Sequence, residues 1–225
     1  MAVRDYSEVV EFKSKFGFES SELKQILTMA INDQVESSKA SHPATVAGIS
    51  FWGNVIALLS DVLCLPGSEW SRIDFKNLPI LYSESFRIAI LTQSGDENVG
   101  SRSQTPKLKR SPGTTALRIL HANSKQRSIF ENHTSDSGMS SKIFNIENYE
   151  VWSILHHAHR IKATNSVERL CYELSMLVPC DEGTDVAERI LFEDIVFEIA
   201  HDLPGIDPMD THSIDIEEND ESDEV

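Results

Sequence analysis

The chain has 225 residues, with 36 acidic and 20 basic side chains, a formal net charge of −16 and 40% hydrophobic residues. This length and hydrophobic content suit one folded domain or two small ones, and ten glycines and eight prolines are too few for a linker or collagen-like protein. Three cysteines argue against a disulfide scaffold and fit a reducing compartment, so we expect a cytoplasmic protein.

Two amphipathic stretches predict a helical hairpin in the first part of the chain. Ser20 or Ser21 can cap a first helix, whose apolar residues recur at the three-and-four spacing of one buried face. Pro43 interrupts this pattern, and a more apolar second stretch over residues 44–65 predicts another helix, which ends at Pro66.

This second stretch requires a membrane test, because residues 44–60 carry no charge and approach the length that spans a bilayer. Five glycine or polar residues interrupt this stretch: Gly48, Ser50, Gly53, Asn54 and Ser60. The charged residue Asp61 follows them. We therefore expect a buried core helix and no membrane contact.

After residue 80 the hydrophobic period changes to that of strands. Alternation over 86–90 predicts a half-buried strand that ends near Thr92, and alternation over 170–178 predicts a second strand. Asp181-Glu182-Gly183 supplies turn residues, so we expect a β-hairpin across 168–195.

Two further segments complete the predicted fold. Residues 151–155 fit either a strand or a helix, and residues 195–200 fit a short terminal helix. Helices first and strands later predict an α+β fold: an N-terminal helical hairpin followed by a small, mainly antiparallel sheet.

Charge and composition divide the chain into four parts. We expect a mainly helical N-terminal part (1–93), a basic, loop-rich connector with one short helix (94–145), an α+β C-terminal part (146–205) and an acidic disordered tail (206–225). Residues 207–225 hold nine acids and no Lys or Arg, a run that repels itself and buries too little to offset its ordering entropy. The tail is either a solvated extension or a polyanion that competes with nucleic acid for a basic surface.

The main candidate site is the basic segment, residues 102–127, which holds seven basic residues and no acid. A helix predicted to begin near Gly113, Thr114 or Thr115 would present free backbone amides beside these cations, as phosphate sites do. The alternative is a solvated loop that neutralises the acidic body or tail. The expected phosphate or nucleic-acid contacts are Lys107, Lys109, Arg110, Thr114 and Arg118.

Several short patterns occur in and beyond the basic segment: residues 94–100, 106–115, Asn123, 172–175 and 188–190. Together they resemble a pattern in uncharacterised bacterial proteins encoded near phage and mobile-element genes. The resemblance implies a bacterial, cytoplasmic setting and a role in phage-related conflict, and it names no activity and no catalytic residue.

A histidine cluster supplies the candidates for a metal site. On a strand, His157 and His159 of the run that begins at His156 would share a face, which makes these two the candidate metal ligands. No HExxH, CxxC or regularly spaced acid accompanies them, so surface or packing histidines are the favoured interpretation, and no cofactor is predicted.

Two functions are compatible with these features. The first is a non-catalytic accessory or regulatory protein that acts through contacts with other protein subunits, with weak phosphate or nucleic-acid contact by the basic segment. The alternative is a metal-dependent hydrolase or nuclease that uses Asp, Glu and His residues, among them Asp96, Glu97 and Glu173, because magnesium needs only a few carboxylates. The lack of a recognised catalytic motif favours the first function.

Overall fold

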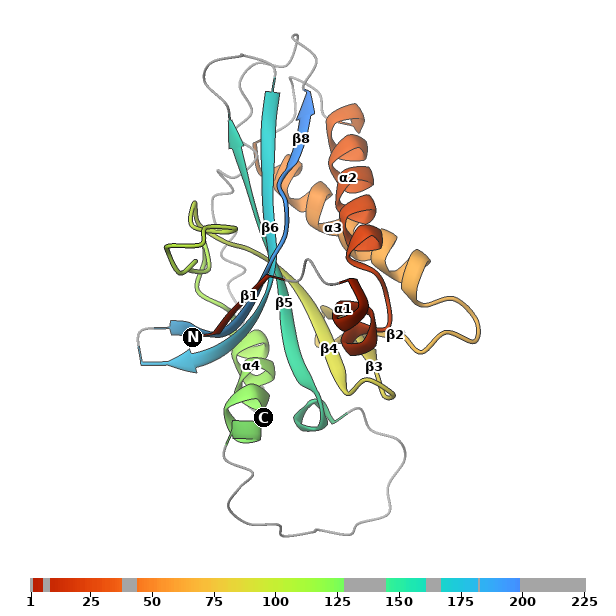
Figure 1. Cartoon of the computed structure of the whole chain (residues 1–225), viewed down its shortest axis with the longest axis vertical. Coiled ribbons are helices and arrows are strands. Elements are labelled where there is room, and N and C mark those ends of the chain that lie inside the picture. Colours follow the sequence, from red (N-terminus) through yellow and green to blue (C-terminus); the bar gives the residue numbers. More distant parts are fainter. Residues whose placement is uncertain are drawn as a thin grey trace, which may run out of the picture.

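The computed structural model describes six stretches of the chain: residues 2–5, 9–37, 44–127, 145–160, 167–181 and 183–198. They form a mixed eight-stranded sheet with helices on both faces (Figure 1). The predicted α+β class is therefore confirmed. The predicted acidic tail, residues 206–225, lies outside the described residues.

Three helices come first in the chain and cover one face of the sheet: α1 (Val9–Phe16), α2 (Ser20–Ser37) and α3 (Ala44–Leu63). Helices α2 and α3 occupy the two predicted helical stretches and pack against each other. The buried face of α2 has the predicted spacing and comprises Leu23, Ile26, Leu27, Ala30 and Ile31.

Helix α3 is a core helix, as the polar interruptions in its sequence predicted. Phe51, Val55 and Leu59 lie one turn apart and are almost fully buried in the core between the helices and the sheet. Among the described helices, none combines the length and apolar character needed to cross a membrane.

The sheet has the strand order β1-β7-β6-β5-β4-β3-β2, and β8 pairs with β6. Strand β1 is parallel to β7 and β4 is parallel to β5, whereas the other pairings are antiparallel. The strands are β1 (Ala2–Asp5), β2 (Ser71–Phe75), β3 (Leu78–Ser83), β4 (Ile88–Ser94), β5 (Glu150–Arg160), β6 (Val167–Cys180), β7 (Gly183–Leu191) and β8 (Ile195–Glu198).

The β4–β5 pairing joins strands from the first and third parts of the sequence into one sheet. Because the two strands are parallel, the chain must cross from one end of the sheet to the other between them. That crossing contains the β4–α4 loop (residues 95–113), helix α4 (Thr114–Arg127) and the short helix η1 (Ile146–Asn148). The loop and α4 cover the face opposite α1–α3.

The predicted hairpin across 168–195 is confirmed as β6 and β7, but the predicted terminal helix over 195–200 is wrong. Residues 195–198 instead form β8, which pairs with β6 just beyond the end of β7. Ile195 and Phe197 are buried whereas Val196 is 63% exposed, the alternation of a strand. The open edge of β6 offers backbone hydrogen bonds that a short isolated helix would lack.

The two central strands, β5 and β6, bury side chains on both faces of the sheet. From β5, Trp152 and Ile154 join the core beneath α1–α3, whereas Val151 and Leu155 join the core beneath α4. A strand covered on both sides loses the alternation between apolar and polar residues, which explains why residues 151–155 were ambiguous in the sequence.

Asn123 of α4 joins the helix to the sheet where β5 and β6 diverge. Its Nδ2 donates to the carbonyl oxygens of Val151 (2.8 Å) and Leu177 (2.7 Å), and its Oδ1 accepts from the Val151 amide at 2.8 Å. The β5–β6 register would place Val151 opposite Leu177, but the pairing stops at Ser153 and Ser175. The buried carboxamide thus replaces a rung of the ladder and fixes α4 over both strands.

We expect Asn123→Ala to lower the free energy of unfolding by about 3 kcal/mol, because three buried backbone groups lose their partner. His121→Ala, at an exposed position two residues earlier on α4, is the control and should change stability by less than about 0.5 kcal/mol. Urea unfolding monitored by circular dichroism measures both. Equal stabilities of the two variants would contradict the role assigned to Asn123.

Candidate functional site

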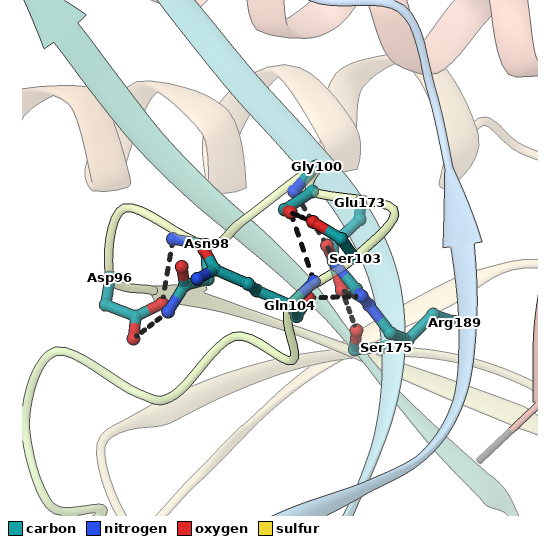
Figure 2. A network of polar contacts seen from close by, with 9 residues as sticks. Asp96, Asn98, Gly100, Ser103, Gln104, Glu173, Ser175 and Arg189 are labelled. Atoms are coloured by element: carbon teal, nitrogen blue, oxygen red, sulfur yellow. Dashed lines mark hydrogen bonds and ion pairs between the residues drawn. The ribbon is translucent and has the colours of Figure 1, made fainter.

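A buried ion pair on the α4 face positions the β4–α4 loop (Figure 2). Glu173 of β6 and Arg189 of β7 are both fully buried, and they form two hydrogen bonds, Nε–Oε1 at 2.9 Å and Nη2–Oε2 at 2.5 Å. Such a two-pronged pair is strong and directional, so these two side chains are held in one arrangement.

The loop completes the hydrogen bonding of this pair. The Gly100 amide donates to Glu173 Oε2 at 2.8 Å, Arg189 Nη1 donates to the Gln104 carbonyl at 2.8 Å, and Ser175 donates to Glu173 Oε1. A buried ion pair is tolerated only when its remaining donors and acceptors are satisfied. The pair and the loop therefore stabilise each other.

The second half of the loop returns to the end of β4 and places the basic residues there. The Lys109 amide donates to the Ser94 carbonyl at 3.0 Å, and the Lys107 carbonyl accepts from the Asp96 amide at 2.9 Å. The side chains of Lys107, Lys109 and Arg110 are exposed. The backbone of this segment is thus anchored at Lys107 and Lys109.

The structure divides the predicted phosphate contacts into groups. Lys109 and Arg110 line a cavity of about 340 Å³, described below. The other three predicted contacts do not line that cavity: Lys107, Thr114 and Arg118. Thr114 is the first residue of α4, and both Thr114 and Arg118 are exposed.

Lys107 and Arg110 line a neighbouring pocket on the side of the β6–β7 turn. The same pocket is lined by two acids, Asp181 and Asp185. This juxtaposition favours the alternative in which part of the basic segment balances acids of the body, at least on this side of the loop.

The predicted metal ligands are not brought into a metal site. The Nδ1 of His157 lies 3.0 Å from the Gly95 carbonyl oxygen, so this ring contacts the β4–α4 loop. The side chain of His159 lies outside the described residues. Nowhere in the described ranges do three or more His, Cys, Asp or Glu residues come together as a potential metal site.

The carboxylates considered for a hydrolase have other contacts. Asp96 accepts from the backbone amide and the side-chain amide of Asn98, both at 3.1 Å, which makes it a turn-forming residue. Glu97 is exposed, and Glu173 is in the buried ion pair.

Burial, together with the nearby Asp194 carboxylate, raises the pKa of Cys171 to about 12, so this thiol stays protonated and is a poor nucleophile at neutral pH.

The 340 Å³ cavity lies between α2, α3 and the ends of β4 and β5, and Leu78 of β3, Leu108 of the β4–α4 loop and Ala116 of α4 also line it. Apolar and aromatic side chains form most of its walls: Ile31, Ile49, Phe51, Trp52, Ala158 and Leu170. Residues 108–112 of the β4–α4 loop close one side and bring Lys109 and Arg110 to its edge. An apolar cavity of this size with a few polar groups is typical of a small-molecule site.

His156 of β5 lines this cavity and lacks hydrogen-bond partners. Its ring is 3% exposed, and neither Nδ1 nor Nε2 has a partner within the described part of the chain. The hydroxyl of Thr92, on β4, is likewise buried in the cavity lining without one. The ring packs edge-on against Phe51 with centroids 4.9 Å apart. Buried polar atoms without partners are uncommon in folded proteins and call for a specific explanation.

Burial keeps the His156 ring neutral. It lowers the pKa of His156 to about 4, and the neighbouring His157 adds a smaller effect in the same direction. A neutral imidazole has one N–H donor and one acceptor nitrogen. His156 therefore offers the cavity a donor and an acceptor.

The sequence alone did not distinguish His156 from its neighbours. The signal was its position in the strand: His156 is in phase with Trp152 and Ile154, and so points to the α1–α3 face, whereas His157 points to the α4 face. Using that signal required knowing that residues 151–155 form a strand and that both of its faces are covered.

Comparisons with protein-family models, curated proteins and solved structures found no match to this chain.

We expect Arg189→Met to lower the free energy of unfolding by about 3–5 kcal/mol, because it leaves the Glu173 carboxylate buried without its cation. Arg169→Met, which removes an arginine from an exposed pair with Asp194, is the matched control and should cost less than about 1 kcal/mol. Adding Glu173→Leu to Arg189→Met should restore part of the loss, and denaturant unfolding measures all three variants. No recovery in the double variant would show that the buried charge is not the cause.

We expect His156 to make stability depend on pH. Between pH 6.5 and 4 the unfolded chain binds a proton at this site that the folded chain excludes, so the free energy of unfolding falls as the pH falls through this window. From pH 7 to pH 5 the loss due to His156 should be about 2 kcal/mol. His156→Leu should unfold with a weaker pH dependence by that amount, measured as the difference between wild-type and variant urea curves. Parallel curves would contradict the buried, neutral state of this ring.

Proposed function

We propose that the protein is a non-catalytic accessory or regulatory protein whose site is the cavity beside the basic segment, and that this cavity binds a small ligand carrying an anionic group. The observation that carries the proposal is His156: a buried ring that lines the cavity with a donor and an acceptor, neither of which has a partner among the described residues. A ligand that hydrogen-bonds to this ring would remove the cost of burying it unpaired.

The anionic group follows from the edge of the cavity. Lys109 and Arg110 are exposed, and each lines the cavity from a backbone that is anchored to β4 by the Lys109–Ser94 hydrogen bond. Two cations next to an apolar cavity favour a ligand with an apolar body and an anionic end.

A binding role fits the chemistry of the site better than catalysis. A general base is most effective when its pKa lies near the working pH, and the pKa of His156, about 4, is well below neutrality. The lining of the cavity contains no Asp, Glu or Cys within the described residues. His156 is thus suited to hold a ligand and poorly suited to move a proton.

Contacts with other protein subunits, the bacterial cytoplasmic setting and the link to phage-related conflict belong to the same proposal and have their support in the sequence. Copurification of the full chain from its own cells, analysed for bound protein and for small molecules released on denaturation, addresses these parts directly.

The test uses inorganic pyrophosphate as the probe and two variants that each remove two positive charges. At about ten times its Kd, pyrophosphate should raise the Tm of the wild type by about 4 °C. Lys109→Gln with Arg110→Gln should abolish this shift. Lys107→Gln with Arg118→Gln, the control from the same basic segment but outside the cavity, should retain it.

Loss of the shift in both double variants would indicate that net charge alone attracts the anion. No shift in the wild type at any concentration up to about 10 mM would contradict the proposed anion site.

A further inference from the structure

The cavity has three zones with different chemistry, and together they specify a class of ligand. The inner zone has the His156 ring and the Thr92 hydroxyl, the walls are mainly apolar and aromatic with Gln34, Gln93 and Ser94 among them, and the edge has Lys109 and Arg110. This inference deepens the proposed function and rests on it, because it names the ligand that the same cavity would take.

The inner zone favours a ligand that both donates and accepts hydrogen bonds. The neutral His156 ring needs an acceptor for its N–H and a donor for its other nitrogen, and the Thr92 hydroxyl can serve in either role. A phosphate or carboxylate in its ionised form has acceptors only. Such a group alone would leave one His156 nitrogen unpaired, so the buried end of the ligand must be a neutral group with both functions.

The walls favour a flat ring for that buried end. Phe51 and Trp52 of α3 line the cavity together with the aliphatic side chains of Ile31 and Leu170. A planar heteroaromatic ring places its polar edge against His156 and Thr92 and its apolar faces against these walls. Stacking of a nucleobase on an aromatic side chain contributes about 1–3 kcal/mol.

The edge of the cavity provides for a phosphate. Besides Lys109 and Arg110, the lining includes Ser111 and Ala116, the latter in the first turn of α4, where backbone N–H groups have no partner within the helix. Cations, a hydroxyl and a helix N-terminus are a common combination at bound phosphates.

We infer that the cavity is a mononucleotide site, with the base against His156 and Thr92 and the phosphate at Lys109 and Arg110. At about 340 Å³, the cavity lies near the lower end of the range for small-molecule sites and suits one compact ligand.

A free nucleotide fits this site better than a nucleic-acid strand does. Next to the phosphate position, Asp181 and Asp185 share a pocket with Lys107 and Arg110. A strand that continued over the loop on that side would bring further phosphates close to these carboxylates.

The experiment is isothermal titration of the full chain with AMP, GMP, CMP and UMP, with the corresponding nucleosides, with inorganic phosphate and with a single-stranded oligonucleotide. At least one nucleoside monophosphate should bind about tenfold more tightly than both its nucleoside and inorganic phosphate. His156→Leu should weaken that nucleotide about tenfold and leave inorganic phosphate unchanged, since it removes only the contact with the base.

The paired double variants distinguish the sites. Lys109→Gln with Arg110→Gln should reduce nucleotide binding to the level of the nucleoside, and both of its positions are exposed. Lys107→Gln with Arg118→Gln should bind the nucleotide as the wild type does. The Tm of each variant without ligand, measured beforehand, identifies any variant that fails to fold.

Three results would overturn the inference. If phosphate or pyrophosphate binds through Lys109 and Arg110 but no nucleotide binds more tightly, the nucleotide assignment fails and the proposed anion site stands. If no anion binds, the nucleotide assignment and the proposed anion site both fail. If the oligonucleotide binds more tightly than every mononucleotide, and Lys107→Gln with Arg118→Gln weakens it, the basic segment is a nucleic-acid surface instead.

Discussion

The buried ion pair between Glu173 and Arg189 is the interaction on which the site depends most. Two charges removed from water are stable only if they bond each other and if their remaining donors and acceptors are satisfied. Backbone groups of the β4–α4 loop, at Gly100 and Gln104, meet that need. The loop is consequently drawn onto the sheet, and its return toward β4 brings Lys109 to the edge of the cavity.

The two faces of the central strands β5 and β6 bury different kinds of polar group. On the α4 face, two sets of buried polar contacts hold the elements together: Asn123 joins α4 to β5 and β6, and the ion pair holds the loop. On the α1–α3 face, the core is apolar except around the cavity, where Gln34, Thr92 and His156 are buried polar residues of the lining. Among the described buried side chains, Thr92 and Ser153 each leave a hydroxyl without a partner, whereas His156 leaves both ring nitrogens, and the proposed ligand would supply partners for them.

The environments of the reactive groups described above favour the proposed binding role over catalysis. His156 is neutral because it is buried, Cys171 is protonated for the same reason, and Asp96 is occupied in a turn. The desolvation that makes a hydrogen bond to His156 valuable also makes the ring a weak base. The same cavity therefore suits recognition of a ligand by shape, hydrogen bonding and charge.

The sequence alone determined the elements whose pattern is local: the helices α2 and α3 from their three-and-four spacing, the β6–β7 hairpin from alternation and turn residues, and the basic segment from its charge. Only the tertiary structure decided which elements meet. It made residues 195–198 a strand on the open edge of β6, paired Glu173 with Arg189, and separated His156 from His157 by face. Periodicity records the neighbours of a residue within a turn or two, whereas sheet register and burial on the second face depend on contacts between residues far apart in the chain.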